Sequence, residues 1–215
     1  MQLSAILYDL DGTIAETDPL HFIVWQECLR EYEIEITEAI YQQRMSGQTN
    51  LPIVIDFLPH LTAAEGEALG EQKEARFREL AAQLQPTAGL QTVIDWGKQH
   101  GLKQAIVTNA PSKNVYHILQ ALKLDQMFDL VVIADDLGIW KPDPAPYAHA
   151  LKEFGVQPEQ AIAFEDSISG VRSAISAKIP TIGITSGQTP ETLYDLGVKL
   201  AITDFTAPEL WALLK

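Results

Sequence analysis

The stretch Ile6-Leu7-Tyr8-Asp9-Leu10-Asp11-Gly12-Thr13 joins an apolar strand segment to a glycine turn and carries two carboxylates one residue apart. Alternate side chains of a strand share a face, so Asp9 and Asp11 are predicted to point into the same crevice, about 6.6 Å apart. Because two unpaired carboxylates are too costly to bury, we expect a cation or a set of donors to meet them. Alternatively, both aspartates cap a solvated strand end, since an isolated D-x-D-G motif often has no further meaning.

Short β-branched runs alternate with helical patterns along most of the chain. The predicted strands cover residues 5–8, 104–108, 130–134, 161–164 and 181–184. The predicted helices between them cover residues 92–100, 112–122, 146–154, 169–177 and 190–196. This alternation predicts an α/β fold in which helices cover both faces of a parallel sheet. Ligands are then expected at the carboxyl ends of the strands.

Residues 16–82 interrupt the alternation, because they show helical patterns at 21–32 and 63–84 and no convincing strand. The sequence therefore predicts a helical insert after the first strand, and a core made of residues 1–15 and 83–215.

Three of the insert's basic residues, Lys73, Arg76 and Arg78, lie close together on one predicted helix. They are either a cationic site or an ordinary solvated face paired with Glu74 and Glu79.

The composition limits the class of protein. The chain has 215 residues and a formal net charge of −14, which argues against binding nucleic acid or an anionic membrane surface. We expect a cytoplasmic protein, because the N-terminus lacks the pattern of a signal peptide and no run of about 18 apolar residues occurs. The single cysteine, Cys28, allows no disulfide framework and is interpreted as a small core residue.

Other predicted strand and loop ends carry residues that suit a phosphate or a metal. Thr108 and Asn109 bring a hydroxyl and a turn amide to a strand end, although the same segment also fits an ordinary helix cap. Lys141 precedes a proline-stiffened turn and is either a phosphate-neutralising cation or an exposed loop lysine. Glu165 and Asp166 end another strand and fit either a helix cap or a metal site.

Taken in order, D-x-D-G-T, a threonine at a strand end, K-P-D-P and E-D-S resemble the haloacid dehalogenase-like superfamily. The resemblance covers residues 6–187 and implies a Rossmann-like, three-layer α/β/α core. The insert is similar to the helical-bundle cap of the phosphoglycolate phosphatase and β-phosphoglucomutase subgroup. The resemblance thus implies a catalytic core of residues 1–15 and 83–215 and a cap of residues 16–82.

The resemblance also implies a role for each core motif. Asp9 would be the nucleophile that accepts the phosphoryl group, and Asp11 would act as general acid and then as general base. Thr108, Asn109 and Lys141 would hold the phosphoryl oxygens. Because Asp11 supplies a proton to a leaving oxygen, the pattern favours phosphoryl transfer over the cleavage of a carbon–halogen bond.

The same resemblance implies Mg²⁺ as the cofactor. Asp9 and Asp166 would contribute carboxylates, Asp11 its main-chain carbonyl, and Glu165 would lie in or beside the metal's coordination sphere. A cation is needed there, because an anionic nucleophile has to approach an anionic phosphate.

Specificity is expected from the insert, since the core motifs handle only phosphate, metal and nucleophile. His21, Gly47, Gln48 and Lys73 match cap positions that face the substrate in the subgroup, although His21 also fits the polar side of an amphipathic helix. Trp140 departs from the family pattern, which usually has glycine before the lysine.

The sequence therefore predicts a magnesium-dependent phosphatase of a small phosphorylated metabolite, such as phosphoglycolate or a sugar phosphate. The expected partner is a small phosphate ester, and the expected assembly is a monomer or a weak homodimer. A β-phosphoglucomutase-like phosphomutase is the alternative. A non-catalytic, metal-dependent binding protein is the third hypothesis, against which the intact acidic and lysine motifs speak.

Overall fold

The computed structural model describes residues 3–214 and contains a six-stranded sheet in the order β3-β2-β1-β4-β5-β6. Every neighbouring pair of strands is parallel. The strands are β1 (Ala5–Tyr8), β2 (Lys103–Thr108), β3 (Leu130–Ile133), β4 (Ala161–Glu165), β5 (Thr181–Ile184) and β6 (Leu200–Ile202). The predicted α/β fold with a parallel sheet is confirmed.

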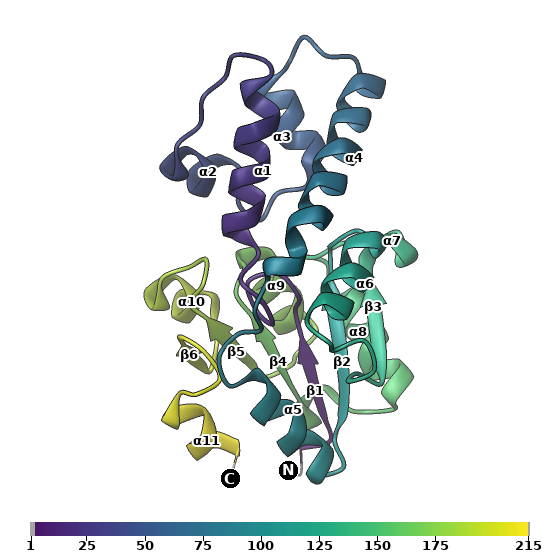
Figure 1. Ribbon diagram of the computed structural model, residues 1–215. Coiled ribbons are helices and arrows are strands. Elements are labelled where there is room, and N and C mark those ends of the chain that lie inside the picture. The colour runs from purple at the N-terminus through teal and green to yellow at the C-terminus, as the bar shows by residue number, and fades with distance from the viewer. Residues whose placement is uncertain (1–2, 215) are drawn as a thin grey trace. The chain divides into compact units, whose positions relative to one another are not determined.

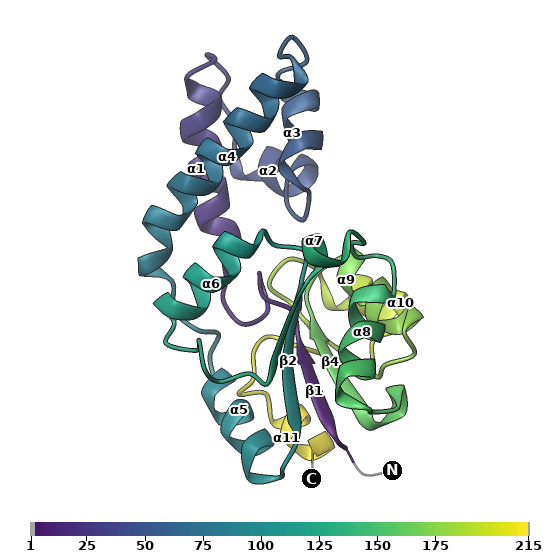
Figure 2. The same cartoon turned by 90° about the vertical axis from the view of Figure 1, so that its right-hand side faces the viewer.

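Helices cover both faces of this sheet, which gives three layers (Figures 1 and 2). Helices α5 (Leu90–Gln99) and α6 (Ser112–Ala121) lie on one face, whereas α8 (Ala145–Phe154), α9 (Ile168–Ser176) and α10 (Pro190–Leu196) lie on the other. The remaining short elements are α7 (Ala134–Leu137), the 3-10 helix η2 (Pro158–Gln160) and α11 (Pro208–Leu214).

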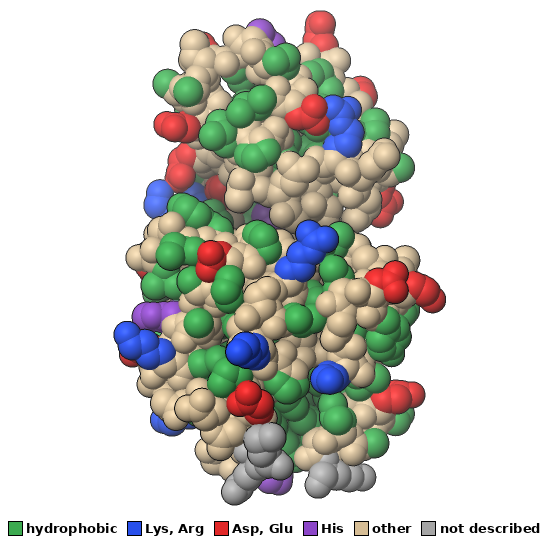
Figure 3. Space-filling model, turned by 180° about the vertical axis from the view of Figure 1, so that it is seen from behind, with side chains coloured by type: hydrophobic (Ala, Val, Ile, Leu, Met, Phe, Trp, Pro, Cys, Tyr) green, Lys and Arg blue, Asp and Glu red, His purple; other side chains and the backbone are tan. Residues whose placement is uncertain are grey.

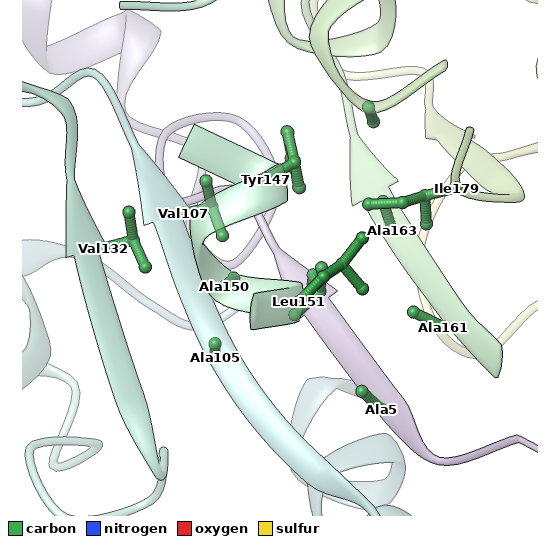
Figure 4. Packing of buried hydrophobic residues seen from close by; sticks show 12 residues of the cluster. Ala5, Ala105, Val107, Val132, Tyr147, Ala150, Leu151, Ala161, Ala163 and Ile179 are labelled. Carbon is green, nitrogen blue, oxygen red and sulfur yellow. The ribbon is translucent and has the colours of Figure 1, made fainter. Parts of the chain in front are cut away.

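The core between the sheet and α8 combines alanines and larger apolar residues of the strands with apolar residues of the helix (Figure 4). All four residues of β1 are buried, as expected for a parallel strand covered on both faces. On α8, Tyr147, Ala150 and Leu151 recur at helical spacing and pack against this side of the sheet. Alanines on three neighbouring strands, such as Ala5, leave room for α8 to approach closely.

The chain divides into two compact units. The first, which contains the sheet, comprises the chain up to Glu16 and from Gln85 onward, and the second is Thr17–Leu84. The second unit contains only helices: α1 (Asp18–Arg30), α2 (Glu38–Arg44), α3 (Asn50–Phe57), α4 (Ala63–Leu80) and the 3-10 helix η1 (Ala81–Gln83). Its function as a cap stays a prediction.

Several short elements differ from the sequence predictions. Helices α2 and α3, with seven and eight residues, were not predicted. The strand β6 was also missed, because three residues are too few to show an alternation. Strand β1 ends at Tyr8, so the two aspartates follow the strand instead of standing on it.

No helix within residues 3–214 is both long enough and apolar enough to span a membrane. On the face of the molecule drawn in Figure 3, lysine and arginine side chains stand apart from one another among apolar and acidic ones. The described residues on this face of the molecule therefore form no continuous basic surface.

Candidate active site

The carboxyl ends of β1, β2 and β4 lie side by side and carry the motif residues of the core unit. The chain builds the sheet outward from β1 in both directions, through β2 on one side and β4 on the other. Open α/β sheets bind ligands where the strand order reverses in this way. The main-chain N–H of Asp9 donates to the carbonyl of Phe164 at 3.0 Å, which holds the first aspartate at this reversal.

A buried ammonium group joins the three strand ends. The Nζ atom of Lys141 lies 2.6 Å from Asp9 Oδ1, 2.6 Å from Glu165 Oε1 and 2.7 Å from the carbonyl oxygen of Val107. An ammonium carries three hydrogens, so each acceptor receives one. The alternative of an exposed loop lysine is wrong, because Lys141 is only 6% exposed.

The charges around Lys141 are tightly coupled. Burial alone would lower the pKa of Lys141, but the carboxylates of Asp9 and Glu165 outweigh it and raise that pKa above its ordinary value. Burial raises the pKa of Asp9 to about 8, with Glu165 and Asp11 adding to the effect and Lys141 opposing it. One lysine is therefore not enough positive charge for this set of acids.

The acids meet the requirements of a hard divalent cation. Asp9, Glu165 and Asp166 each offer a carboxylate oxygen, and these oxygens lie within 4.8 Å of one another. Oxygen atoms are the ligands that Mg²⁺ and Ca²⁺ prefer, and Lys141 is a single positive charge among these three acids. The acidic cluster could therefore hold a metal.

The carboxylate of Asp166 is held by residues that follow two other strands. The hydroxyl of Ser186, after β5, lies 3.2 Å from Asp166 Oδ2 and donates to the carbonyl of Gly12 at 2.7 Å. Thr13 Oγ1 lies 3.5 Å from Asp166 Oδ1. Gly12 has a φ of +76°, and a Cβ atom there would lie 2.1 Å from Asp166 Oδ2. Only glycine leaves the room that this carboxylate occupies.

Glu165 is fully buried and accepts hydrogen bonds from three side chains. Its Oε1 atom accepts from Lys141 and from the hydroxyl of Tyr147, the latter at 2.7 Å. Its Oε2 atom accepts from the hydroxyl of Ser167 at 3.3 Å. Burial, together with the neighbouring carboxylates of Glu165 and Asp9, raises the pKa of Tyr147. Its hydroxyl therefore stays protonated and donates a hydrogen bond to Glu165.

Thr108 and Asn109 follow the Val107 carbonyl at the end of β2. Thr108 Oγ1 accepts the main-chain N–H of Ala110 at 2.9 Å, and Thr108 is 1% exposed. The side chain of Asn109 exchanges two hydrogen bonds with the main chain of Lys141: Nδ2 donates to the carbonyl at 3.2 Å, and Oδ1 accepts the N–H at 3.0 Å. The Asn109 side chain thus fixes the loop that carries the lysine.

Trp140 is accommodated at the surface. Its indole N–H donates to Asp135 Oδ1 at 2.7 Å, and the residue is 45% exposed.

Two of the predicted cap residues meet inside the second unit. Lys73 Nζ lies 2.7 Å from His21 Nδ1 and 2.9 Å from Glu74 Oε1, and the lysine is 3% exposed. The His21 ring stacks on Phe77 with 4.1 Å between the ring centroids. Burying a lysine with a histidine and a glutamate costs desolvation free energy, and such buried polar clusters are common at functional sites.

The two arginines of the same helix pair with glutamates, and only Arg76 does so with a well-exposed side chain. Arg76 pairs with Glu27 at 2.9 Å and with Glu79 at 2.8 Å. Arg78 lies 3.6 Å from Glu71. The interpretation of Arg76 as part of a solvated face is confirmed.

Gly47 and Gln48 are exposed and lie in the loop between α2 and α3. The Gln48 side chain donates to the carbonyl of Arg44 at 3.0 Å. The hydroxyl of Ser46, just before them, donates to Asp18 Oδ2 at 2.6 Å, which ties this loop to the start of α1.

Sequence reasoning missed Tyr147, Ser186 and the Val107 carbonyl. No local pattern marks them, because each acquires its role from a partner far away in the sequence, such as Gly12 for Ser186 at a separation of 174 residues. The one available signal was a tyrosine on the core-facing side of the helix that follows K-P-D-P, which reads as ordinary core.

Comparisons with known proteins cover nearly the whole chain. Residues 6–184 match the family model described as haloacid dehalogenase-like hydrolase. The chain is 31% identical over 184 residues to a phosphorylated carbohydrates phosphatase from Thermotoga maritima, with 84% of each protein covered.

Solved structures agree with this match. A HAD hydrolase of family IA, variant 3, from Entamoeba histolytica is 28% identical, with a TM-score of 0.88 and 99% of each chain covered. The protein CbbY from Rhodobacter sphaeroides, crystallised in complex with phosphate, is 26% identical, with a TM-score of 0.83 and 95% of each chain covered.

Proposed function

The chain belongs to the haloacid dehalogenase-like hydrolase family, and we propose that it is a magnesium-dependent phosphatase of small phosphorylated metabolites. The predictions of this family and of a phosphatase-type enzyme are confirmed by the family match and by the names of the relatives. The observation that carries the finer proposal is the meeting of Asp9, Lys141, Glu165 and Asp166 at neighbouring strand ends.

In the first step, a carboxylate oxygen of Asp9 attacks the phosphorus atom of the ester. The oxygen–phosphorus bond to the leaving alcohol breaks, and Asp11 gives its proton to that oxygen. The product is an aspartyl phosphate on Asp9 and a free alcohol. The Lys141 ammonium, 2.6 Å from Asp9 Oδ1, supports the negative charge that spreads over the phosphoryl oxygens.

In the second step, water attacks the phosphorus atom and transfers a proton to Asp11. The bond between phosphorus and Asp9 breaks, which releases inorganic phosphate and restores both aspartates. Thr108 ends β2, directly after the Val107 carbonyl that Lys141 contacts, and Asn109 follows it; we assign both to the phosphoryl group as well.

Mg²⁺ would be held by Asp9 and Asp166, with the main-chain carbonyl of Asp11 as a further ligand. The ion supplies the positive charge that offsets repulsion between the phosphate and the acids. For Glu165 we favour a place beside the ion, because Lys141, Tyr147 and Ser167 already donate to its two oxygens.

We assign substrate selection to the helical unit and, within it, to His21, Gly47, Gln48 and Lys73. Lys73 is the residue best suited to a second anionic group on the substrate, because it is a cation held in place by two side chains. Phosphoglycolate and sugar phosphates are therefore the substrate classes to test first.

A phosphomutase of the β-phosphoglucomutase type is the second candidate, because His21 and Lys73 match cap positions of that enzyme type. In that case the phosphoryl group of the aspartyl phosphate passes to a second hydroxyl of a sugar phosphate instead of to water, which gives a sugar bisphosphate and free Asp9. The bisphosphate then returns its other phosphoryl group to Asp9 and leaves as the isomerised sugar phosphate. The two candidates are separated by adding a sugar bisphosphate and measuring whether isomerised sugar phosphate or inorganic phosphate accumulates.

The deciding experiment is turnover of p-nitrophenyl phosphate with MgCl₂ and with EDTA, followed by a screen of phosphorylated metabolites with phosphate detection. Magnesium-dependent release that is lost in Asp9→Asn supports both enzyme candidates. No turnover with magnesium, together with magnesium binding that Asp9→Asn weakens, would instead support the non-catalytic, metal-dependent binding protein.

A further inference from the structure

Tyr147 brings a hydroxyl group into the apolar core beneath the candidate site. It is 0% exposed and belongs to the hydrophobic cluster drawn in Figure 4, on the face of α8 that packs against the sheet. The steps proposed for Asp9, Asp11 and Lys141 do not use this hydroxyl. A buried hydroxyl is costly unless it is hydrogen-bonded, so its partner indicates what it does.

That partner is a carboxylate oxygen which the lysine also uses. The Tyr147 hydroxyl donates to Glu165 Oε1 at 2.7 Å, and Lys141 Nζ donates to the same atom at 2.6 Å. The Lys141 ammonium also lies 5.1 Å from the centroid of the Tyr147 ring. Tyr147 therefore contacts both members of the ion pair, through its hydroxyl and through its ring.

We propose that Tyr147 is a positioning residue, which fixes Glu165 so that the Lys141 ammonium stays directed at Asp9 and the phosphoryl group. This inference rests on the proposed function. Without the hydroxyl, Glu165 Oε1 keeps one side-chain donor instead of two, and the carboxylate gains freedom to turn. Since Glu165 and Asp9 share the three hydrogens of one ammonium with Val107, a change at Glu165 changes the direction of the bond to Asp9.

The chain provides a matched control in Tyr8. This residue is also 0% exposed, and its hydroxyl donates to Gln104 Oε1 at 2.9 Å. Tyr8→Phe and Tyr147→Phe therefore both remove a buried hydroxyl, of which only that of Tyr147 donates to a residue of the candidate active site.

The first test is kinetic. For Tyr147→Phe we expect kcat to fall about tenfold and KM to change less than about twofold. This pattern is expected because Tyr147 does not touch the substrate but orients Lys141, through Glu165, toward the transition state. Tyr8→Phe is expected to keep the kcat of the wild-type protein. Thermal melting of both variants shows whether the fall in kcat parallels a fall in melting temperature. A merely structural role of Tyr147 would require that it does.

The second test does not depend on turnover. Buried with three acceptors, the Lys141 ammonium should exchange its hydrogens slowly with water and give its own ¹H–¹⁵N signal, assigned by its loss in Lys141→Met. We expect this signal to shift or broaden in Tyr147→Phe and to stay unchanged in Tyr8→Phe.

The outcomes separate the two proposals. If the wild-type protein has no phosphatase activity, the proposed function fails, and the ammonium signal alone decides the role of Tyr147. An ammonium signal unchanged in Tyr147→Phe, or a fall in kcat no larger than that of Tyr8→Phe, overturns the inference. Absence of the signal from the wild-type protein overturns it too, because the buried ammonium is its premise.

Discussion

A substitution at Asp9 is expected to abolish turnover without lowering the stability of the protein. Asp9→Asn keeps the shape of the side chain and an oxygen for Lys141 but removes the nucleophile, so turnover should fall by at least about 10⁴-fold. Because the pKa of Asp9 is raised by burial, removing its charge should leave the melting temperature at pH 8 equal or higher. Steady-state kinetics and thermal melting test both points. A residual activity above roughly a few percent of the wild-type value would contradict the assignment of Asp9 as nucleophile.

Asp11 is expected to affect the proton transfers alone. Asp11→Asn should lower kcat by about 10²–10⁴-fold, the usual contribution of general acid–base catalysis. The loss should be smaller for p-nitrophenyl phosphate than for an alkyl phosphate, since a nitrophenolate leaves without being protonated. Equal losses on both esters would argue against a role as the acid.

The pH dependence of metal binding follows from the pKa of Asp9 near 8 in the metal-free protein. The folded protein holds a proton that the unfolded chain has already released, so the metal-free protein loses stability as the pH rises from the ordinary carboxyl range towards 8. A divalent ion binds the ionised form and must displace this proton at low pH. We therefore expect the rise in melting temperature caused by MgCl₂ to be larger at pH 8.5 than at pH 5.5.

Asp9→Asn is the control for this effect, because it removes the titrating group. In that variant the difference between the two pH values should largely disappear. A magnesium effect that is larger at the lower pH in the wild-type protein would contradict the expectation.

At the residue scale, the sequence could predict the acids and the lysine but not how they are held. Lys141 could be predicted because K-P-D-P stands in a recognisable order with the acidic motifs. The hydroxyls of Tyr147 and Ser186 could not, since their partners Glu165 and Gly12 reach them only through the three-dimensional fold.

At the scale of single elements, α9 contains Gly170, although glycine is unfavourable within a helix. Alanine is favoured over glycine in a helix by about 1 kcal/mol, yet a Cβ atom on Gly170 would lie 1.9 Å from Glu165 Oε2. Gly170→Ala should therefore lower both the melting temperature and kcat, because Glu165 has to move. Ser176→Ala, at an exposed position of the same helix, should raise the melting temperature slightly. Stabilisation by Gly170→Ala would show that Glu165 moves freely.

Elements were predictable where their local signal was clear. Helix α8 shows apolar residues at helical spacing over ten residues, and strand β4 is a continuous apolar run that ends at two acids. Helix α10 is as short as α2 but begins at Thr189-Pro190, which marks a helix start, whereas the three-residue strand β6 is too short to show a pattern. For α2, the Thr37 side chain accepts the N–H of Ile40 at 3.3 Å, and such a cap is visible only as one common residue in the sequence.

At the scale of the whole molecule, the helical unit is predicted to decide which ester is cleaved. Lys73→Met should change the ranking of sugar phosphates and phosphoglycolate by about tenfold or more while altering p-nitrophenyl phosphate turnover much less. Arg76→Met, three residues later on α4 but at an exposed surface pair, should change neither.

Lys73→Met also leaves Glu74 buried without its lysine, which destabilises the helical unit. The double variant Lys73→Met/Glu74→Gln removes that charge as well and separates stability from specificity. Equal losses on every substrate in the double variant would show that Lys73 is structural.

The fold of the whole chain was predictable because the alternation of strands and helices restricts the topology to few choices. The substrate was not, because the motifs to which we assign phosphate, metal and nucleophile contacts are common to a large family, and we assign the choice of ester to other residues.

The two chain crossings between the units leave the core at neighbouring points. Ala15 pairs with Pro86 in an isolated antiparallel bridge, and the N–H of Thr87 donates to the carbonyl of Ile14 at 2.8 Å. An insertion whose two ends are already tied together places no tension on the sheet, whatever its length. A different insertion, longer or shorter than residues 17–84, could therefore be joined to the sheet at this junction without a change in the strands.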